Sequence, residues 1–147
     1  MILPFGLIIS RQISWQTNLL DRKLQTEQIL TGDIIITEIL QGFRKESSYQ
    51  AAKEALLALP FASLCGKEIA LKSVENFREL RKNGIAIRKT IDMIIATFCI
   101  ERDIFLLHLD KDFESIKTVL PLKQFQKSCN KMKFNSPPFF NTLIFQF

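Results

Sequence analysis

The stretch TIDMIIATFCIERDIFLLHLDKDFE, residues 90–114, decides the fold class of this chain. Its first half has the apolar spacing of a helix that begins near Thr90, and residues 104–109 form an apolar run typical of a buried strand. Short apolar strands that alternate with helices along the chain indicate a parallel sheet covered by helices on both faces. We therefore predict an α/β fold.

Carboxylates lie at both ends of this stretch. Asp92 falls in the first turn of the predicted helix, and Asp110 and Asp112 follow the strand. Ligands of open α/β sheets bind outside the carboxyl ends of the strands. Glu38 borders the apolar stripe of an earlier helix, beside Gly42. Because no cysteine or histidine cluster is nearby, these oxygen ligands predict a hard cation such as Mg²⁺.

Each of these residues also has a structural interpretation. A single acid can form a salt bridge with Arg88 or Lys89, or can interact with the helix dipole, and the segment LDKD (109–112) is also an ordinary polar turn. Arg88, Lys89 and Lys111 are candidates for binding a nucleic-acid backbone by charge, or for a solvated basic rim. The residues alone leave both interpretations open.

The length, charge and cysteine content of the chain favour some classes of protein function over others. A chain of 147 residues fits one domain, and its net charge of +5 and pI near 9.2 favour an anionic partner, either nucleic acid or an acidic protein. Three scattered cysteines and one histidine disfavour zinc and predict free thiols in the cytoplasm. Residues 1–10 are apolar but too short to span a bilayer and lack a basic leader, so we expect no membrane association.

The pattern of apolar residues and breakers predicts the elements and domain limits. We expect one unit over residues 1–122, with an atypical start at 1–15, and an atypical tail at 123–147, an appendage that does not continue the alternation of strands and helices. The predicted helices of the first unit are 16–30, 33–44, 47–59, 67–82, 91–101 and 112–119. Its predicted strands begin with residues 2–3, followed by 61–64 and 104–109, with an edge strand at 120–122.

Four segments carry a resemblance to a known family: TEILQGFR (37–44), LRKNG (80–84), RKTIDMIIATF (88–98) and LLHLDKDF (106–113). Together they resemble the PIN-domain family, and most closely the VapC-type toxins of bacterial type II toxin–antitoxin systems. The likeness runs from about residue 16 to residue 122.

This resemblance implies a three-layer α/β/α sandwich and an endoribonuclease that depends on Mg²⁺ or Mn²⁺. It further implies a VapB-type antitoxin as partner and a homodimer. Glu38, Asp92 and either Asp110 or Asp112 match the acidic positions of the family, which makes all four candidates for catalysis and metal binding.

The start of the chain departs from the family. The family opens with an apolar strand that ends in an essential Asp, whereas Met1–Leu3 here is followed by Pro4-Phe5-Gly6, and no acid precedes Asp21. The loss of one ligand predicts impaired cleavage, and the alternative is an inactive protein that still binds the antitoxin. One hypothesis is a reading-frame shift, because a frame read one base late converts codons for Val-Trp-Ile-Asp-Tyr-Phe into Phe-Gly-Leu-Ile-Ile, as at 5–9. Resequencing the locus tests it, and an intact frame contradicts it.

Overall fold

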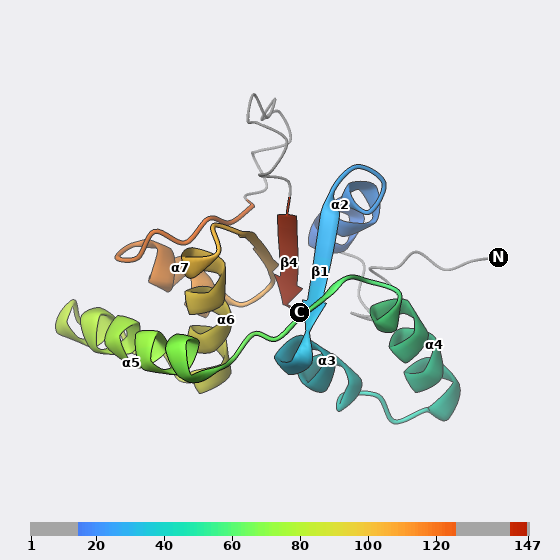
Figure 1. Ribbon diagram of the computed structural model, residues 1–147, viewed down its shortest axis with the longest axis horizontal. Helices are drawn as coiled ribbons and strands as arrows, with labels where there is room; N and C mark the ends of the chain where they lie inside the picture. Colours follow the sequence, from blue (N-terminus) through green and yellow to red (C-terminus); the bar gives the residue numbers. More distant parts are fainter. Residues whose placement is uncertain (1–14, 126–141, 147) are drawn as a thin grey trace.

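A computed structural model describes residues 15–125 and 142–146 of the chain (Figure 1). The described strands are β1 (Gln28–Gly32), β2 (Phe61–Ala62), β3 (Phe105–His108) and β4 (Thr142–Gln146). The described helices are α2 (Trp15–Lys23), α3 (Asp33–Leu40), α4 (Glu46–Leu57), α5 (Lys67–Lys82), α6 (Thr90–Glu101) and α7 (Lys111–Lys117). The predictions for residues 1–14, including the first strand, lie outside the described residues.

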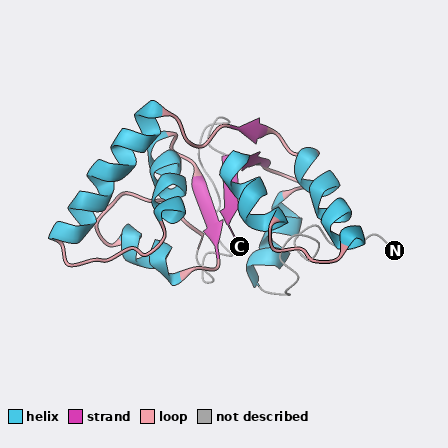
Figure 2. Ribbon diagram, turned by 90° about the horizontal axis from the view of Figure 1, so that it is seen from below, coloured by secondary structure: helices cyan, strands magenta, loops and turns pink. Residues whose placement is uncertain are grey.

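The four described strands form one sheet in the order β2-β1-β4-β3, and every pair of neighbours is parallel. Helices α5, α6 and α7 lie to one side of the strands, and α3 and α4 lie to the other (Figure 1). The strands run through the middle of the molecule with helices on both sides (Figure 2). The predicted α/β fold with a short parallel sheet is thus confirmed, in a form consistent with an α/β/α sandwich.

Strand β4 places the end of the chain inside the sheet. Its residues pair with β1 on one side and β3 on the other, and Ile144 and Phe145 are fully buried. The expectation that residues 123–147 form an appendage that does not continue the alternation of strands and helices is therefore wrong for 142–146. Local composition could not predict this strand, because strand pairing depends on partners far away in the sequence.

The predicted helix 16–30 is also wrong in its second half. Helix α2 ends at Lys23, and residues 28–32 form β1 instead. Ile29 and Thr31, two residues apart, are both buried, as expected for one face of a strand. The short run ILT shares apolar spacing with the helix before it, so periodicity alone did not separate the two elements.

Helices α5 and α6 agree well with the sequence. Helix α5 has the predicted bounds, and its end is closed by Gly84, which has a φ of 75°, while the Ile85 N–H donates to the Leu80 carbonyl. Glycine adopts this left-handed conformation readily, and this pattern terminates many helices. The predicted edge strand at 120–122 is replaced by a single parallel bridge between Leu106 and Gln124.

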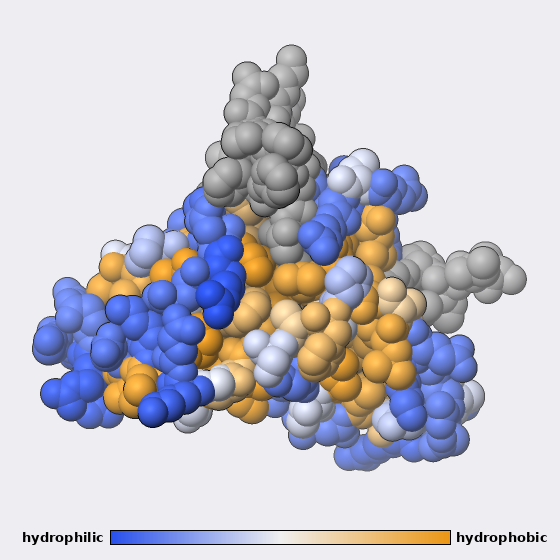
Figure 3. Space-filling view, in the orientation of Figure 1, coloured by the Kyte–Doolittle hydropathy of each residue, from blue (hydrophilic) through white to orange (hydrophobic). Residues whose placement is uncertain are grey.

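A continuous apolar core joins the helices to the sheet. Its fully buried members come from helices and strands alike: Leu20, Ile35, Leu56, Leu80, Ile95, Leu106, Phe113 and Phe145 are examples. Apolar surface also gathers at the middle of one face, with hydrophilic surface over α5 and α4 (Figure 3). No helix in the described part of the chain is both long and apolar enough to cross a bilayer.

Candidate metal centre

Asp92 is the most unusual acid of the described residues. It lies in the first turn of α6, is only 1% exposed, and no hydrogen-bond donor within the described ranges reaches its Oδ2 atom. Burial raises its pKa to about 6; the Lys89 ammonium opposes this shift, and the charges of Asp110, Asp112 and Glu38 add to it. A buried carboxylate without a partner is costly unless a cation neutralises it.

Asp110 and Asp112 come from the turn between β3 and α7, at the carboxyl end of the sheet. Asp110 caps α7, because its Oδ1 accepts a hydrogen bond of 3.0 Å from the Asp112 N–H. Its other oxygen, Oδ2, accepts from Lys89 Nζ at 2.9 Å. These two donors hold the pKa of Asp110 below its usual range, the backbone donor first. Asp110 is therefore ionised and fixed in place.

The three aspartates meet at one point. One carboxylate oxygen each from Asp92, Asp110 and Asp112 can be chosen so that all three lie within 4.8 Å of one another. Three converging carboxylate oxygens, one of them from the buried Asp92, match the ligand preference of Mg²⁺ or Mn²⁺. The helix–strand–turn stretch that decides the fold thus supplies the residues that would hold the metal.

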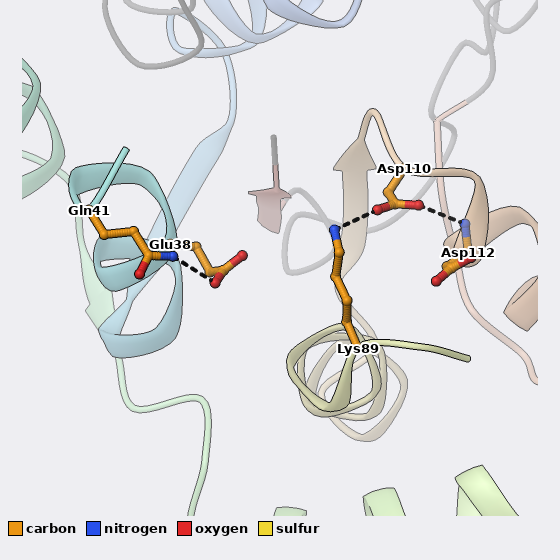
Figure 4. A network of polar contacts seen from close by, with 5 residues as sticks. All are labelled: Glu38, Gln41, Lys89, Asp110 and Asp112. Carbon is orange, nitrogen blue, oxygen red and sulfur yellow. Dashed lines mark hydrogen bonds and ion pairs between the residues drawn. The ribbon is translucent and has the colours of Figure 1, made fainter. Parts of the chain in front are cut away.

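Glu38 stands at the margin of this cluster. It projects from α3 toward the side on which Lys89 and Asp110 lie, and its Oε1 accepts from Gln41 Nε2 at 3.1 Å (Figure 4). It does not belong to the three converging oxygens, although its charge contributes to the raised pKa of Asp92. The structure thus does not test the sequence prediction that Glu38 is a metal ligand. It places the Glu38 side chain on α3, facing Lys89 and Asp110 (Figure 4).

The three predicted basic residues flank the same place. Arg88 and Lys89 immediately precede α6, Lys111 opens α7, and all three are exposed. Lys89 forms an ion pair with Asp110 (Figure 4). The salt-bridge interpretation considered from the sequence therefore applies to Lys89 and Asp110, whereas Asp92 forms no ion pair with any residue in the described ranges 15–125 and 142–146.

A supporting network behind the acidic turn was missed by sequence reasoning. His108 Nε2 lies 2.9 Å from Gln124 Oε1, and Gln124 Nε2 donates to Glu114 Oε2 at 2.7 Å. The His108 ring also packs against Phe113, with ring centroids 4.9 Å apart. Burial lowers the pKa of His108, so the ring is neutral near pH 7. The network joins the end of β3 to α7, on either side of Asp110 and Asp112.

Comparison with known proteins now adds the family. The PIN domain profile matches residues 11–119, which is most of the chain. The chain belongs to the PIN domain family. PIN domains generally have a metal-dependent nuclease fold, and the acidic cluster at the end of the sheet agrees with that chemistry. A comparison with curated proteins finds no match.

Proposed function

We propose that this PIN domain is a VapC-type endoribonuclease that cleaves RNA phosphodiesters with Mg²⁺ or Mn²⁺. The observation that carries the proposal is Asp92, a buried carboxylate with an unsatisfied oxygen beside two further aspartates. A fold that needed Asp92 only for stability would supply it with a donor, since an unsatisfied buried acid destabilises the native state.

The residues of the chain have separate roles in this proposal. Asp92, Asp110 and Asp112 hold the ion, with Glu38 contributing from α3. A bound divalent ion supplies Lewis-acid chemistry, because it polarises a phosphodiester oxygen and lowers the pKa of a water. Arg88 and Lys111, exposed on either side of the aspartates, bind phosphates of the RNA backbone through charge and without sequence preference.

A cleavage assay tests the proposal. The purified chain is incubated with a labelled single-stranded RNA in Mn²⁺, in Mg²⁺ and in EDTA, alongside the variants Asp92→Asn and Glu38→Gln. We expect cleavage in the two metals only, and a loss of roughly a hundredfold or more in Asp92→Asn. Cleavage that survives in EDTA or in Asp92→Asn would contradict the assignment and would point to a contaminating nuclease.

A second candidate function follows from strand β4. Its residues, TLIFQ, include no carboxylate, although β4 is one of the two inner strands of the sheet. Of the described residues, the proposed metal ligands therefore come only from α3, α6 and the turn after β3. This observation favours a PIN protein with weak or no cleavage, which would bind a VapB-type antitoxin and form a homodimer in the cytoplasm. Co-purification with the antitoxin-like product of a neighbouring reading frame, without metal-dependent cleavage, is the result expected for this alternative.

A further inference from the structure

We infer that the Lys89 ammonium is a resident counter-ion of the acidic cluster, which an incoming divalent cation must displace and which then becomes available to an RNA phosphate. This inference rests on the proposed metal-dependent function and adds a regulatory step at the same site. It assigns to Lys89 a role different from that of a static phosphate-binding residue.

The position of Lys89 supports this role. The residue caps the start of α6 in an extended conformation, three residues before Asp92. Its side chain reaches across to the turn after β3, where Nζ lies 2.9 Å from Asp110 Oδ2 (Figure 4). Lys89 therefore connects the two segments that supply the three converging aspartates.

The charge balance points the same way. The hydrogen bond to Asp110 raises the pKa of Lys89, and the charges of Asp92, Asp110 and Glu38 add to this effect, which burial opposes. One ammonium thus compensates the same carboxylates that a metal would compensate. Two cations that share one set of carboxylates repel each other, so the affinity for either falls when the other is in place.

The side chain is also free to move. Lys89 is 58% exposed, and its long stem allows the ammonium to leave Asp110 without rearrangement of α6. Exposed ion pairs contribute little to stability, so a divalent ion can replace this one at low cost. Once displaced, the ammonium remains at the rim of the site, beside Arg88, where an RNA phosphate would approach.

The decisive measurement is metal affinity in the absence of RNA. Isothermal titration calorimetry with Mn²⁺ compares the wild type with Lys89→Met, which keeps the apolar stem but removes the charge. We expect Lys89→Met to bind Mn²⁺ about three- to tenfold more tightly than the wild type, because the substitution removes a partly exposed positive charge that competes with the ion for the carboxylates. The matched control is Lys72→Met, which removes an equal charge from an exposed ion pair, with Glu75 at 3.2 Å on α5. It should leave the affinity unchanged.

The second measurement concerns RNA. Fluorescence anisotropy follows the binding of a short single-stranded RNA with and without Mn²⁺ in the first seconds after mixing, and a gel of the same samples sets this interval shorter than cleavage takes. We expect Mn²⁺ to strengthen RNA binding by the wild type about threefold more than by Lys89→Met, because only the wild type releases an ammonium toward the phosphates.

The outcomes separate the inference from the proposed function. Unchanged or weaker Mn²⁺ binding by Lys89→Met overturns the inference and leaves the metal centre intact. An equal Mn²⁺-dependent gain in RNA affinity for both proteins overturns the release step. The absence of Mn²⁺ binding in both proteins overturns the inference together with the metal centre. Tighter binding by Lys89→Met but not by Lys72→Met supports the displacement.

Discussion

Two aspartates in the first turns of two helices of this PIN domain have opposite surroundings. Asp33 opens α3, and its carboxylate accepts from the Leu64 N–H at 3.0 Å, from Ser63 Oγ at 3.0 Å and from the Ile34 N–H at 2.9 Å. Asp92 lies in the first turn of α6, and within the described residues its Oδ2 accepts from no donor. Both lie in the first turn of a helix, but only Asp33 has donors from the fold on both of its carboxylate oxygens.

The pKa values of the two carboxyls differ accordingly. Partial burial acts to raise the pKa of Asp33, but the donors from Leu64, Ile34 and Ser63 outweigh it and hold the value below the usual range. Burial raises the pKa of Asp92 to about 6. Asp33 therefore fastens the loop after β2 to the start of α3, whereas Asp92 is held in a costly state that a cation would relieve. The hydrogen-bond donors around the carboxylate therefore distinguish the two residues. Asp33 has such donors and is structural, whereas Asp92 has an oxygen without one and is a candidate metal ligand.

The largest expected effect is an increase in the free energy of unfolding when Asp92 of the metal centre is replaced by Asn. Asp92→Asn removes the buried charge, and we expect the free energy of unfolding at pH 7 without metal to rise by up to about 3 kcal/mol. Because the folded-state pKa is raised, protonated Asp92 favours the fold at low pH, and this contribution is lost as pH rises from about 4 through about 6. The gain should therefore be absent near pH 4 and complete above pH 7. Urea unfolding at several pH values measures it.

The matched control for that experiment is Asp110→Asn. The hydrogen bonds from Asp112 and Lys89 stabilise the ionised form of Asp110, so its neutralisation should lower stability at pH 7, with the opposite sign to Asp92→Asn. Both variants should weaken Mn²⁺ binding. A loss of stability in Asp92→Asn would show that the charge of Asp92 is satisfied by the fold, and the contrast with Asp33 would fail.

The next effect in size concerns Asp33. Asp33→Ala removes a charged acceptor from the donors of Ser63 and Leu64, and we expect a loss of about 2 kcal/mol in the free energy of unfolding. Ser63→Ala removes only one of these bonds and should cost less. Mn²⁺ affinity, measured by calorimetry on the folded variants, should stay at the wild-type value. A fall of tenfold or more would place Asp33 in the metal centre after all.

Much of this contrast was readable from the sequence, because it depends on local signals. The apolar stripe of α6 put Asp92 at its border, and the apolar run of β3 put Asp110 and Asp112 at the end of a strand. The bounds of α5, residues 67–82, followed from the pattern of apolar residues and breakers. In each case the signal and the structure lie within one helical turn or one strand of each other.

The remainder depends on contacts between distant segments. The predicted helix 33–44 begins at Asp33, but the partners of this residue, Ser63 and Leu64, are about thirty positions away. Lys89 and Asp110 are twenty-one positions apart, and the sequence left several pairings open. Strand β4 is buried by partners from two different parts of the chain. Periodicity and local propensity carry no information about such partners, which is why the tail and β1 were misassigned.

The smallest expected effect concerns Thr31. It tests whether a buried oxygen without a hydrogen-bond donor is enough to identify a metal ligand. Thr31, next to Gly32 and Asp33, is 1% exposed, and its Oγ1 has no hydrogen-bond partner among the described residues. A neutral hydroxyl costs less to bury than a carboxylate, so Thr31→Val should raise the free energy of unfolding by only about 0.5–1 kcal/mol. Thr97→Val is the control, because the Thr97 hydroxyl accepts from Asn76 Nδ2 at 3.1 Å and its loss should destabilise. If Thr31→Val destabilised the protein as much as Thr97→Val does, its hydroxyl would have a partner. If it weakened Mn²⁺ binding, the metal centre would extend to β1.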